Sequence, residues 1–282
     1  MPATYTSLLR ARWAQGSFLC VGLDADLRRL PASFAEAASP ADAIVAFNTA
    51  IIDATHDLVC AYKPNSAWYE ALGSDGHPAL SRTIHYIKDR YPGIPVILDA
   101  KRGDIGETNA AYARSVFDDL GADCVTVHPY FGRESLEPIL ERADKGVIVM
   151  GANSNPGAGE FQDLPVGPEG EPLYAYVARQ VATHWNALGN CGLTVGATNP
   201  GKIARVREVA PDLPLLVLGI GAQGGDLAAS VHAGLDSRSE GIIVNASRAV
   251  IYASSGPDFQ EAARAAAQSF ATGILAARES RP

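Results

Sequence analysis

The sequence has 282 residues, 47% of them hydrophobic and 19% charged, which is typical of a globular protein with a substantial core. Its 31 acidic and 23 basic residues give a formal charge of −8 without any Lys/Arg block, so binding to nucleic acid or to an anionic membrane is not expected. No apolar run reaches the roughly 18–20 residues of a membrane helix, and the N-terminus lacks the layout of a signal peptide. We therefore expect a cytoplasmic protein.

Eight short apolar runs recur along the chain and are separated by segments of helical character. The runs are nearly continuous in apolar residues and do not alternate, which is typical of parallel strands buried on both faces. They cover residues 18–23, 58–62, 94–98, 124–127, 147–150, 193–195, 215–220 and 242–244.

The segments between these runs carry helix signals. An N-terminal helix is expected over residues 2–15, and Ser39 followed by Pro40 predicts the N-cap and first residue of another helix. Gly121 stands where a helix would end. Apolar side chains recur at helical spacing over residues 44–51, 112–120, 174–188 and 259–270, which we interpret as packing surfaces.

Strands that alternate with helices in this way predict an α/β fold, a (β/α)8 TIM barrel, with residues 1–282 as one domain. An open doubly wound sheet is the alternative, but no Gly-x-Gly-x-x-Gly motif opens a first helix. The helix at residues 2–15 would close the far end of the barrel. Residues 152–172 are rich in Gly and Pro and form a long connection, so they are either a candidate lid or a decorative insertion.

The cysteines show no spacing typical of a metal site. Three lie within apolar runs and the fourth just precedes one, so we expect buried, reduced thiols and neither a disulfide nor a zinc site. No metal site is predicted elsewhere in the chain. The four are Cys20, Cys60, Cys124 and Cys191.

Two acids, Asp99 and Asp104, flank the base Lys101 after the third apolar run. Asp99 and Lys101 are two positions apart at the end of the strand, so their side chains should share a face, and Asp104 follows Gly103 in the loop beyond. Burying carboxylates beside one ammonium is costly without a use for the arrangement. The residues predict a catalytic site, with a purely structural salt-bridge cluster as the alternative.

Polar residues also end most of the other strands, where the active site of such a barrel is expected. Gln223 lies in a glycine-rich turn after the seventh run and Arg248 at a helix start after the eighth, which together predict a phosphate site. His128 ends the fourth run and is interpreted as a histidine held by backbone bonds, outside the chemistry. The remaining residues at strand ends are Asp24, Lys63 and Ser154.

With these residues in place, the chain resembles the orotidine 5′-phosphate decarboxylase family. The motif Asp99-x-Lys101-x-x-Asp104-Ile105 matches the family pattern at every fixed position, and the other strand-end residues follow in the family's order. The length of the chain and the Gly106-Glu107 pair are similar to the longer bacterial branch of the family.

The resemblance implies decarboxylation of orotidine 5′-monophosphate to uridine 5′-monophosphate (UMP) without a metal or cofactor. Lys101 would protonate C6 of the pyrimidine, and Asp99 would lie beside the departing carboxylate. Asp104 would reach the active site of the partner in a homodimer, with Thr108 nearby. For the substrate, Asp24 and Lys63 would hold the ribose hydroxyls, Ser154 the pyrimidine amide edge, and Gln223, Arg248 and the backbone at Ser247 the 5′-phosphate.

Two other functions remain open at this point. One is a magnesium-dependent phosphosugar synthase or keto-sugar-phosphate decarboxylase of the same superfamily. Those relatives usually carry an acid at the end of the second strand, where this chain has Lys63. The other is a non-catalytic protein that binds a phosphorylated metabolite, which would not need the Asp99, Lys101 and Asp104 triplet.

Overall fold

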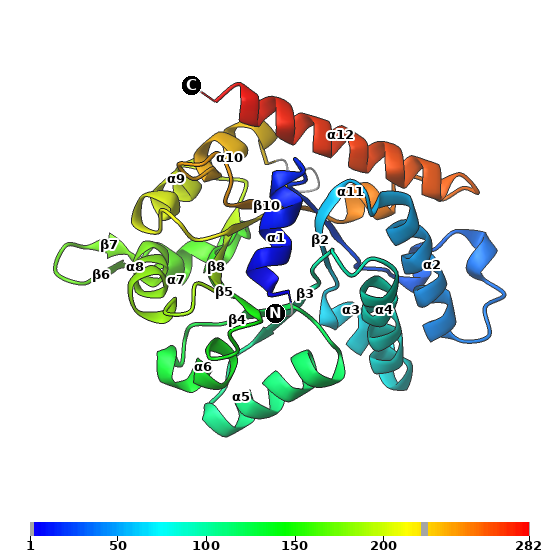
Figure 1. The fold of residues 1–282 in the computed structure, drawn as a ribbon, viewed down its shortest axis with the longest axis horizontal. Coiled ribbons are helices and arrows are strands. Elements are labelled where there is room, and N and C mark those ends of the chain that lie inside the picture. Colours follow the sequence, from blue (N-terminus) through cyan, green and yellow to red (C-terminus); the bar gives the residue numbers. More distant parts are fainter. Residues whose placement is uncertain (1–2, 221–224, 282) are drawn as a thin grey trace.

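The fold is a barrel of parallel strands surrounded by helices (Figure 1), seen in a computed structural model that describes residues 3–220 and 225–281. Each apolar run of the sequence contains or overlaps one barrel strand, so the predicted strands are confirmed. The barrel strands are β1 (Leu19–Gly22), β2 (Val59–Lys63), β3 (Ile97–Arg102), β4 (Cys124–Val127), β5 (Gly146–Ala152), β8 (Cys191–Gly196), β9 (Leu215–Leu218) and β10 (Ile242–Ala246).

The eight strands form one sheet in the order β2-β1-β10-β9-β8-β5-β4-β3, with every pair parallel. The two end strands, β2 and β3, are joined by bridges between Tyr62 and Val96 and between Asn65 and Asp99. The sheet therefore closes on itself, which confirms the (β/α)8 barrel and excludes the open doubly wound sheet.

Helices cover the outside of the barrel between successive strands, as Figure 1 shows. Ser39 accepts a hydrogen bond from the amide of Asp42 and Pro40 opens the helix, as predicted. The helices are α1 (Tyr5–Ala14), α2 (Pro40–Thr55), α3 (Ser66–Glu70), α4 (Gly76–Arg90), α5 (Gly106–Ala113), α6 (Gly132–Leu140), α7 (Gly159–Gln162), α8 (Leu173–Gln180), α9 (Pro200–Val209), α10 (Leu227–Gly234), α11 (Arg248–Ile251) and α12 (Phe259–Glu279). None within the described residues has the length and apolar character needed to cross a membrane.

Helix α1 crosses the amino end of the barrel, where it was expected to act as a plug. Its buried side chains, Tyr5, Leu9 and Trp13, recur every four residues on one face. The Arg12 Nε donates to the carbonyl of Val59, the first residue of β2, at 2.7 Å. With this end covered, ligand access is left to the opposite, carboxyl end.

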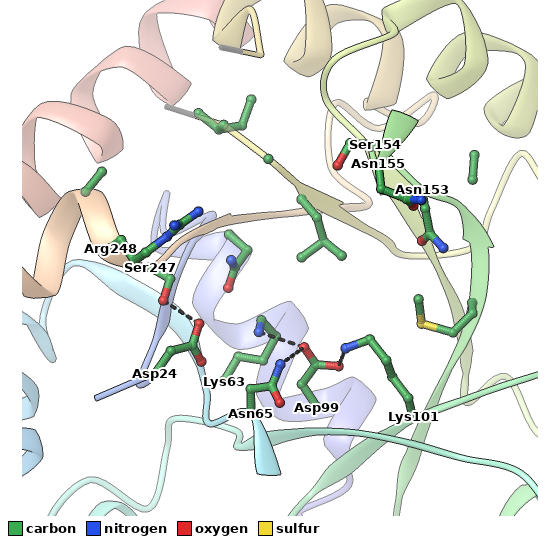
Figure 2. A pocket seen from close by; sticks show the side chains of 18 residues that line it. Asp24, Lys63, Asn65, Asp99, Lys101, Asn153, Ser154, Asn155, Ser247 and Arg248 are labelled. Atoms are coloured by element: carbon green, nitrogen blue, oxygen red, sulfur yellow. Dashed lines mark hydrogen bonds and ion pairs between the residues drawn. The ribbon is translucent and has the colours of Figure 1, made fainter. Parts of the chain in front are cut away.

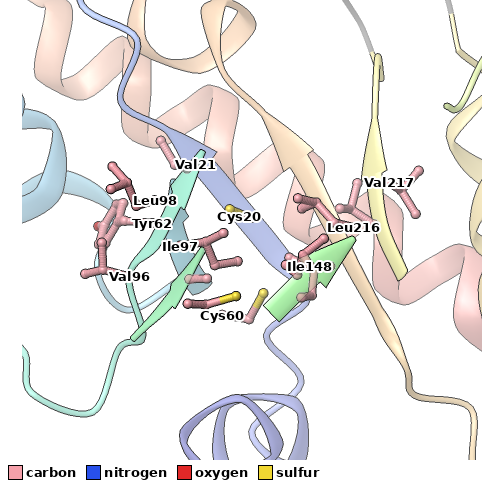
Figure 3. Close-up of a cluster of buried hydrophobic side chains, with 14 of the residues drawn as sticks. Cys20, Val21, Cys60, Tyr62, Val96, Ile97, Leu98, Ile148, Leu216 and Val217 are labelled. Atoms are coloured by element: carbon pink, nitrogen blue, oxygen red, sulfur yellow. The ribbon is translucent and has the colours of Figure 1, made fainter. Parts of the chain in front are cut away.

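The barrel interior is apolar, and Figure 3 shows Cys20 and Cys60 among its aliphatic side chains. All four cysteines are free and buried, as predicted. Burial raises the pKa of the Cys20 thiol to about 12, so this thiol is protonated at neutral pH.

The long segment after β5 has more structure than a loop. The strand extends to Ala152, and the segment then contains the short helix α7 and a hairpin of β6 (Pro165–Val166) and β7 (Glu171–Pro172). Lys202 pairs with Asp163 and thereby ties the segment to α9. The Gly/Pro-rich composition obscured these elements because each is only a few residues long.

Candidate active site

A cavity of about 360 Å³ opens at the carboxyl ends of the strands, as the barrel fold predicts (Figure 2). Seven of the ten predicted site residues line it; Asp104 and Thr108 do not, and Gln223 lies outside the described residues. The seven come from the ends of five strands: Asp24, Lys63, Asp99, Lys101, Ser154, Ser247 and Arg248.

The Asp99 carboxylate is the centre of a charged network in this cavity. Figure 2 shows Lys63 and Lys101 approaching it from opposite sides: Lys101 Nζ donates to Oδ1 at 2.7 Å, and Lys63 Nζ donates to Oδ2 at 3.0 Å. The side chains of Lys63 and Asp99 are 3% and 7% exposed, whereas that of Lys101 is 39% exposed. The exposed ammonium therefore faces the cavity while its counter-ion is buried beneath it.

These contacts hold the network in its charged form. Burial by itself raises the pKa of Asp99, but the attraction of Lys63 and Lys101 outweighs burial and holds that pKa well below its ordinary value. Burial likewise lowers the pKa of Lys63, yet Asp24 and Asp99 together raise it above the ordinary value. Asp99 and Lys63 are thus both charged at neutral pH.

Lys101 reaches this position through an unusual backbone conformation. Its φ of +47° lies in the left-handed region, which is disfavoured for residues other than glycine, and the pairing of β3 with β4 shifts register here. Thr126 on β4 stabilises the bend, because its Oγ1 accepts from the Lys101 amide at 2.9 Å and donates to Asp99 Oδ1 at 2.9 Å. Simple alternation along a strand correctly predicted a shared site for Asp99 and Lys101 but not this geometry.

Sequence reasoning missed Asn65 and Thr126 as supports of the network. Asn65 follows β2, donates from Nδ2 to Asp99 Oδ2 at 3.3 Å, and accepts the amide of Ala67 at 3.1 Å. The Lys63-Pro64-Asn65 sequence at a strand end was an available signal for Asn65. Thr126 had no comparable signal, because a threonine inside a β-strand is ordinary.

The opposite side of the cavity carries the groups predicted to bind phosphate, and Figure 2 places Ser247 and Arg248 there, away from Lys101. Ser247 Oγ donates to Asp24 Oδ2 at 2.6 Å. A side chain on Gly22 would approach Ser247 Oγ to 2.7 Å, so only glycine fits beside this contact. The predicted helix start at Arg248 is present, but α11 has only four residues and its dipole is correspondingly small.

Asp104 and Thr108 lie on the β3–α5 connection, outside the cavity of their own chain. Asp104 Oδ1 accepts the amide of Ile105 at 2.7 Å, and Asn109 Nδ2 donates to the Asp104 carbonyl at 2.6 Å. These bonds give the connection a defined shape. Ile105 beside them is 65% exposed.

His128 stands next to the network but does not line the cavity. Its backbone amide donates to the carbonyl of Arg102 at 2.8 Å, as expected of a histidine at a strand end. Burial and, secondarily, the Lys101 charge lower its pKa, which favours the neutral ring. Among the described residues, no group of three or more His, Cys, Asp or Glu side chains is arranged to hold a metal ion.

Comparison with known proteins identifies the family. A model described as "Orotidine 5'-phosphate decarboxylase / HUMPS family" matches residues 17–266. The orotidine 5′-phosphate decarboxylase of Azoarcus sp. (strain BH72) is 52% identical over 264 residues, which cover 93% of this chain and 95% of that protein.

Solved structures agree with this result. The OMP decarboxylase of Leishmania donovani has a TM-score of 0.85 and 42% identity, covering 98% of this chain and 100% of that chain. The UMP synthase of the same organism has a TM-score of 0.88 and 42% identity, and the match covers 99% of this chain and 57% of that chain. The resemblance noted from the sequence is confirmed: the chain belongs to the orotidine 5′-phosphate decarboxylase / HUMPS family.

Proposed function

We propose that this protein is a carboxy-lyase that converts orotidine 5′-monophosphate to UMP, the last step of de novo UMP biosynthesis, without a metal or cofactor. The observation that carries the proposal is the Lys63–Asp99–Lys101 array, in which buried Lys63 and Asp99 support the Lys101 ammonium at a cavity bounded on its other side by Arg248. At one end of the cavity, the Lys101 ammonium offers a proton to a developing carbanion. At the other end, Arg248 offers a permanent cation to a phosphate.

In the proposed mechanism, the bond between C6 and the carboxylate carbon breaks, and its electron pair stays on C6. Asp99 lies beside the departing carboxylate, and Lys101 Nζ gives its proton to C6 as carbon dioxide leaves. Solvent then reprotonates the amine. The carbanion cannot be delocalised into the ring, so a preorganised cation at the developing charge is the main source of stabilisation.

The remaining predicted residues would bind the nucleotide. Asp24 and Lys63 hold the ribose hydroxyls, Ser154 the pyrimidine amide edge, and Gln223, Arg248 and the Ser247 backbone the phosphate. Binding energy from the distant phosphate favours the closed, reactive state, so part of it lowers the barrier at C6. Ser154 lies in the 152–172 segment, which we propose as the lid that excludes water from the cavity.

The donor set argues against a magnesium-dependent sugar-phosphate enzyme of the same superfamily. Lys63 occupies the end of β2, where those relatives usually carry an acid, and its Nζ is 3.0 Å from Asp99. Both carboxylate oxygens of Asp99 are engaged by ammonium groups, which repel a divalent cation.

The test is the fall in absorbance of orotidine 5′-monophosphate with purified protein after dialysis against EDTA. We expect the rate in the chelator to equal the rate in added magnesium. A rate that vanishes in EDTA and returns with magnesium contradicts the proposal. An absence of turnover under both conditions leaves the binding-protein alternative.

We further propose a homodimer in which the β3–α5 connection delivers Asp104 to the partner's cavity, with Thr108 nearby. Three large apolar side chains at the carboxyl ends of β3 and β4 support such an interface. Ile105, Tyr130 and Phe131 are 65%, 90% and 55% exposed, which is costly for a surface that remains in water. We place the dimer in the cytoplasm, where reduced thiols such as those of this chain persist.

The charged array predicts how stability depends on pH. Asp99→Asn removes the carboxylate that is hydrogen-bonded to buried Lys63 and is expected to lower the free energy of unfolding by about 3 kcal/mol near neutral pH. The lowered pKa of Asp99 means that its contribution is present above the ordinary value of 3.8 and is lost as pH falls through the folded-state value.

Urea unfolding of both proteins checks this result. The difference in the free energy of unfolding between wild type and Asp99→Asn should be constant between about pH 5 and 8 and should become smaller below about pH 4. A difference that becomes larger in acid would mean that Asp99 is protonated in the folded protein, contrary to the proposed array.

A further inference from the structure

One buried side chain of the cavity wall belongs neither to the charged network nor to the groups predicted to bind the substrate. Asn245 on β10 lines the cavity and is 8% exposed. Its Oδ1 is fully buried and has no hydrogen-bond partner. Within the described part of the chain, the amide oxygen of Asn245 is therefore left without a donor beside an open cavity.

Two other buried asparagines, Asn190 and Asn109, have partners for their side-chain amides, whereas Asn48, buried away from the cavity, also leaves its Oδ1 unpaired. Asn190 Nδ2 donates to the carbonyls of Leu140, Arg142 and Lys145, at 3.0, 3.3 and 3.1 Å. Asn109 Nδ2 donates to two carbonyls. Because burying an amide without partners is destabilising, an unpaired amide at a cavity wall indicates a ligand that completes its hydrogen bonds.

The chemistry of Oδ1 restricts what that ligand group can be. A buried acceptor needs a donor, which excludes phosphate oxygens in the dianion, carboxylates and carbonyls. Asp24 Oδ1, after the neighbouring strand β1, is a second buried acceptor without a partner among the residues that line the cavity. Hydroxyl groups are suited to this pair, since a hydroxyl donates to one oxygen and can accept from the Asn245 Nδ2 group.

The position of Asn245 indicates that the part of the nucleotide it contacts is the sugar. Asn245 pairs in register with Cys20 on β1, and the residues that follow on these two strands, Ser247 and Asp24, are hydrogen-bonded at 2.6 Å. It thus lies between the predicted phosphate and ribose groups. Ser154, expected at the pyrimidine, follows β5, three places away from β10 in the sheet.

We propose that the Asn245 amide binds a ribose hydroxyl of the nucleotide and so acts as a further substrate-binding residue. The inference rests on the proposed nucleotide substrate. It explains why a destabilising buried amide stands at this position: its hydrogen bonds are completed only in the complex.

The test combines Asn245→Leu, which keeps the side-chain size but removes hydrogen bonding, with Asn190→Leu as the matched structural control. Two quantities are measured for each: the Tm of the ligand-free protein, and the Kd for UMP, 2′-deoxy-UMP and 3′-deoxy-UMP by calorimetry. Asn245→Ala is measured in parallel so that poor packing of leucine cannot decide the result.

We expect Asn245→Leu to keep or raise the Tm while weakening UMP binding about tenfold, the value of one hydrogen bond. For the deoxynucleotide that lacks the contacted hydroxyl, the loss of affinity caused by Asn245→Leu should be less than about twofold. Asn190→Leu should lower the Tm and leave the Kd for UMP unchanged.

Equal losses for all three nucleotides, or a lowered Tm with an unchanged Kd for UMP, would overturn the role of Asn245. If wild type itself binds no UMP, the proposed substrate is wrong, and the role of Asn245, which depends on that substrate, is wrong too. If wild type and both Asn245 variants bind UMP equally well, the proposed role of Asn245 is wrong, but the proposed substrate is unaffected.

Discussion

Lys101→Ala is expected to reduce turnover of orotidine 5′-monophosphate by at least about a thousandfold, the scale on which loss of a general acid or of a preorganised charge acts. Binding of UMP should remain measurable, because the phosphate and ribose contacts are made by other residues. Steady-state rates and calorimetric titration with UMP measure the two effects separately.

Lys101→Arg separates the two roles of the ammonium. Arginine keeps a positive charge at the position but does not give up a proton near neutral pH, so this variant is also expected to be nearly inactive. Near-normal turnover in Lys101→Ala would refute the assignment of Lys101 as proton donor. Substantial activity in Lys101→Arg would show that the charge alone is sufficient.

The shared site makes a second prediction with a large effect. Asp104→Ala and Lys101→Ala should each be inactive alone, yet a mixture of the two chains should recover activity. In a hybrid dimer, one cavity combines Lys101 of one chain with Asp104 of the other, and the second cavity lacks both. Random exchange makes half of the dimers hybrid, so about a quarter of wild-type activity is expected.

The measurement requires subunit exchange to be followed directly, for example by native mass spectrometry, alongside the assay. Hybrid dimers that form without recovering activity would show that Asp104 does not act across the interface. A wild-type protein that remains monomeric while fully active would contradict the shared site itself. Replacing exposed Tyr130 by serine should weaken the dimer if the surface next to Ile105 is the interface.

Much of the barrel follows from local pattern. The continuous apolar runs predict buried parallel strands because both faces of each strand are covered, and this signal does not depend on distant residues. The charged and polar strand ends could be assigned to one site for the same reason, since the carboxyl ends of parallel strands meet at one end of the barrel. Asp24, Lys63 and Arg248 were found in this way.

The supports of the site could not be read from such patterns. Thr126 lies on β4 and Asn65 follows β2, whereas Lys101 is on β3, and only closure of the barrel brings these supports to Asp99. The left-handed backbone at Lys101 is likewise a tertiary effect, because nothing in the neighbouring residues favours it over ordinary strand geometry.

The chain alone therefore determined its strands, the helix starts at Pro40 and Arg248 and the identity of the charged groups at the barrel mouth, because hydrophobic period and residue chemistry are local properties. Tertiary structure decided which of these groups touch, how deeply each is buried and which amide stays unpaired. Those properties depend on the distances between strand ends far apart in sequence, which exist only once the sheet has closed.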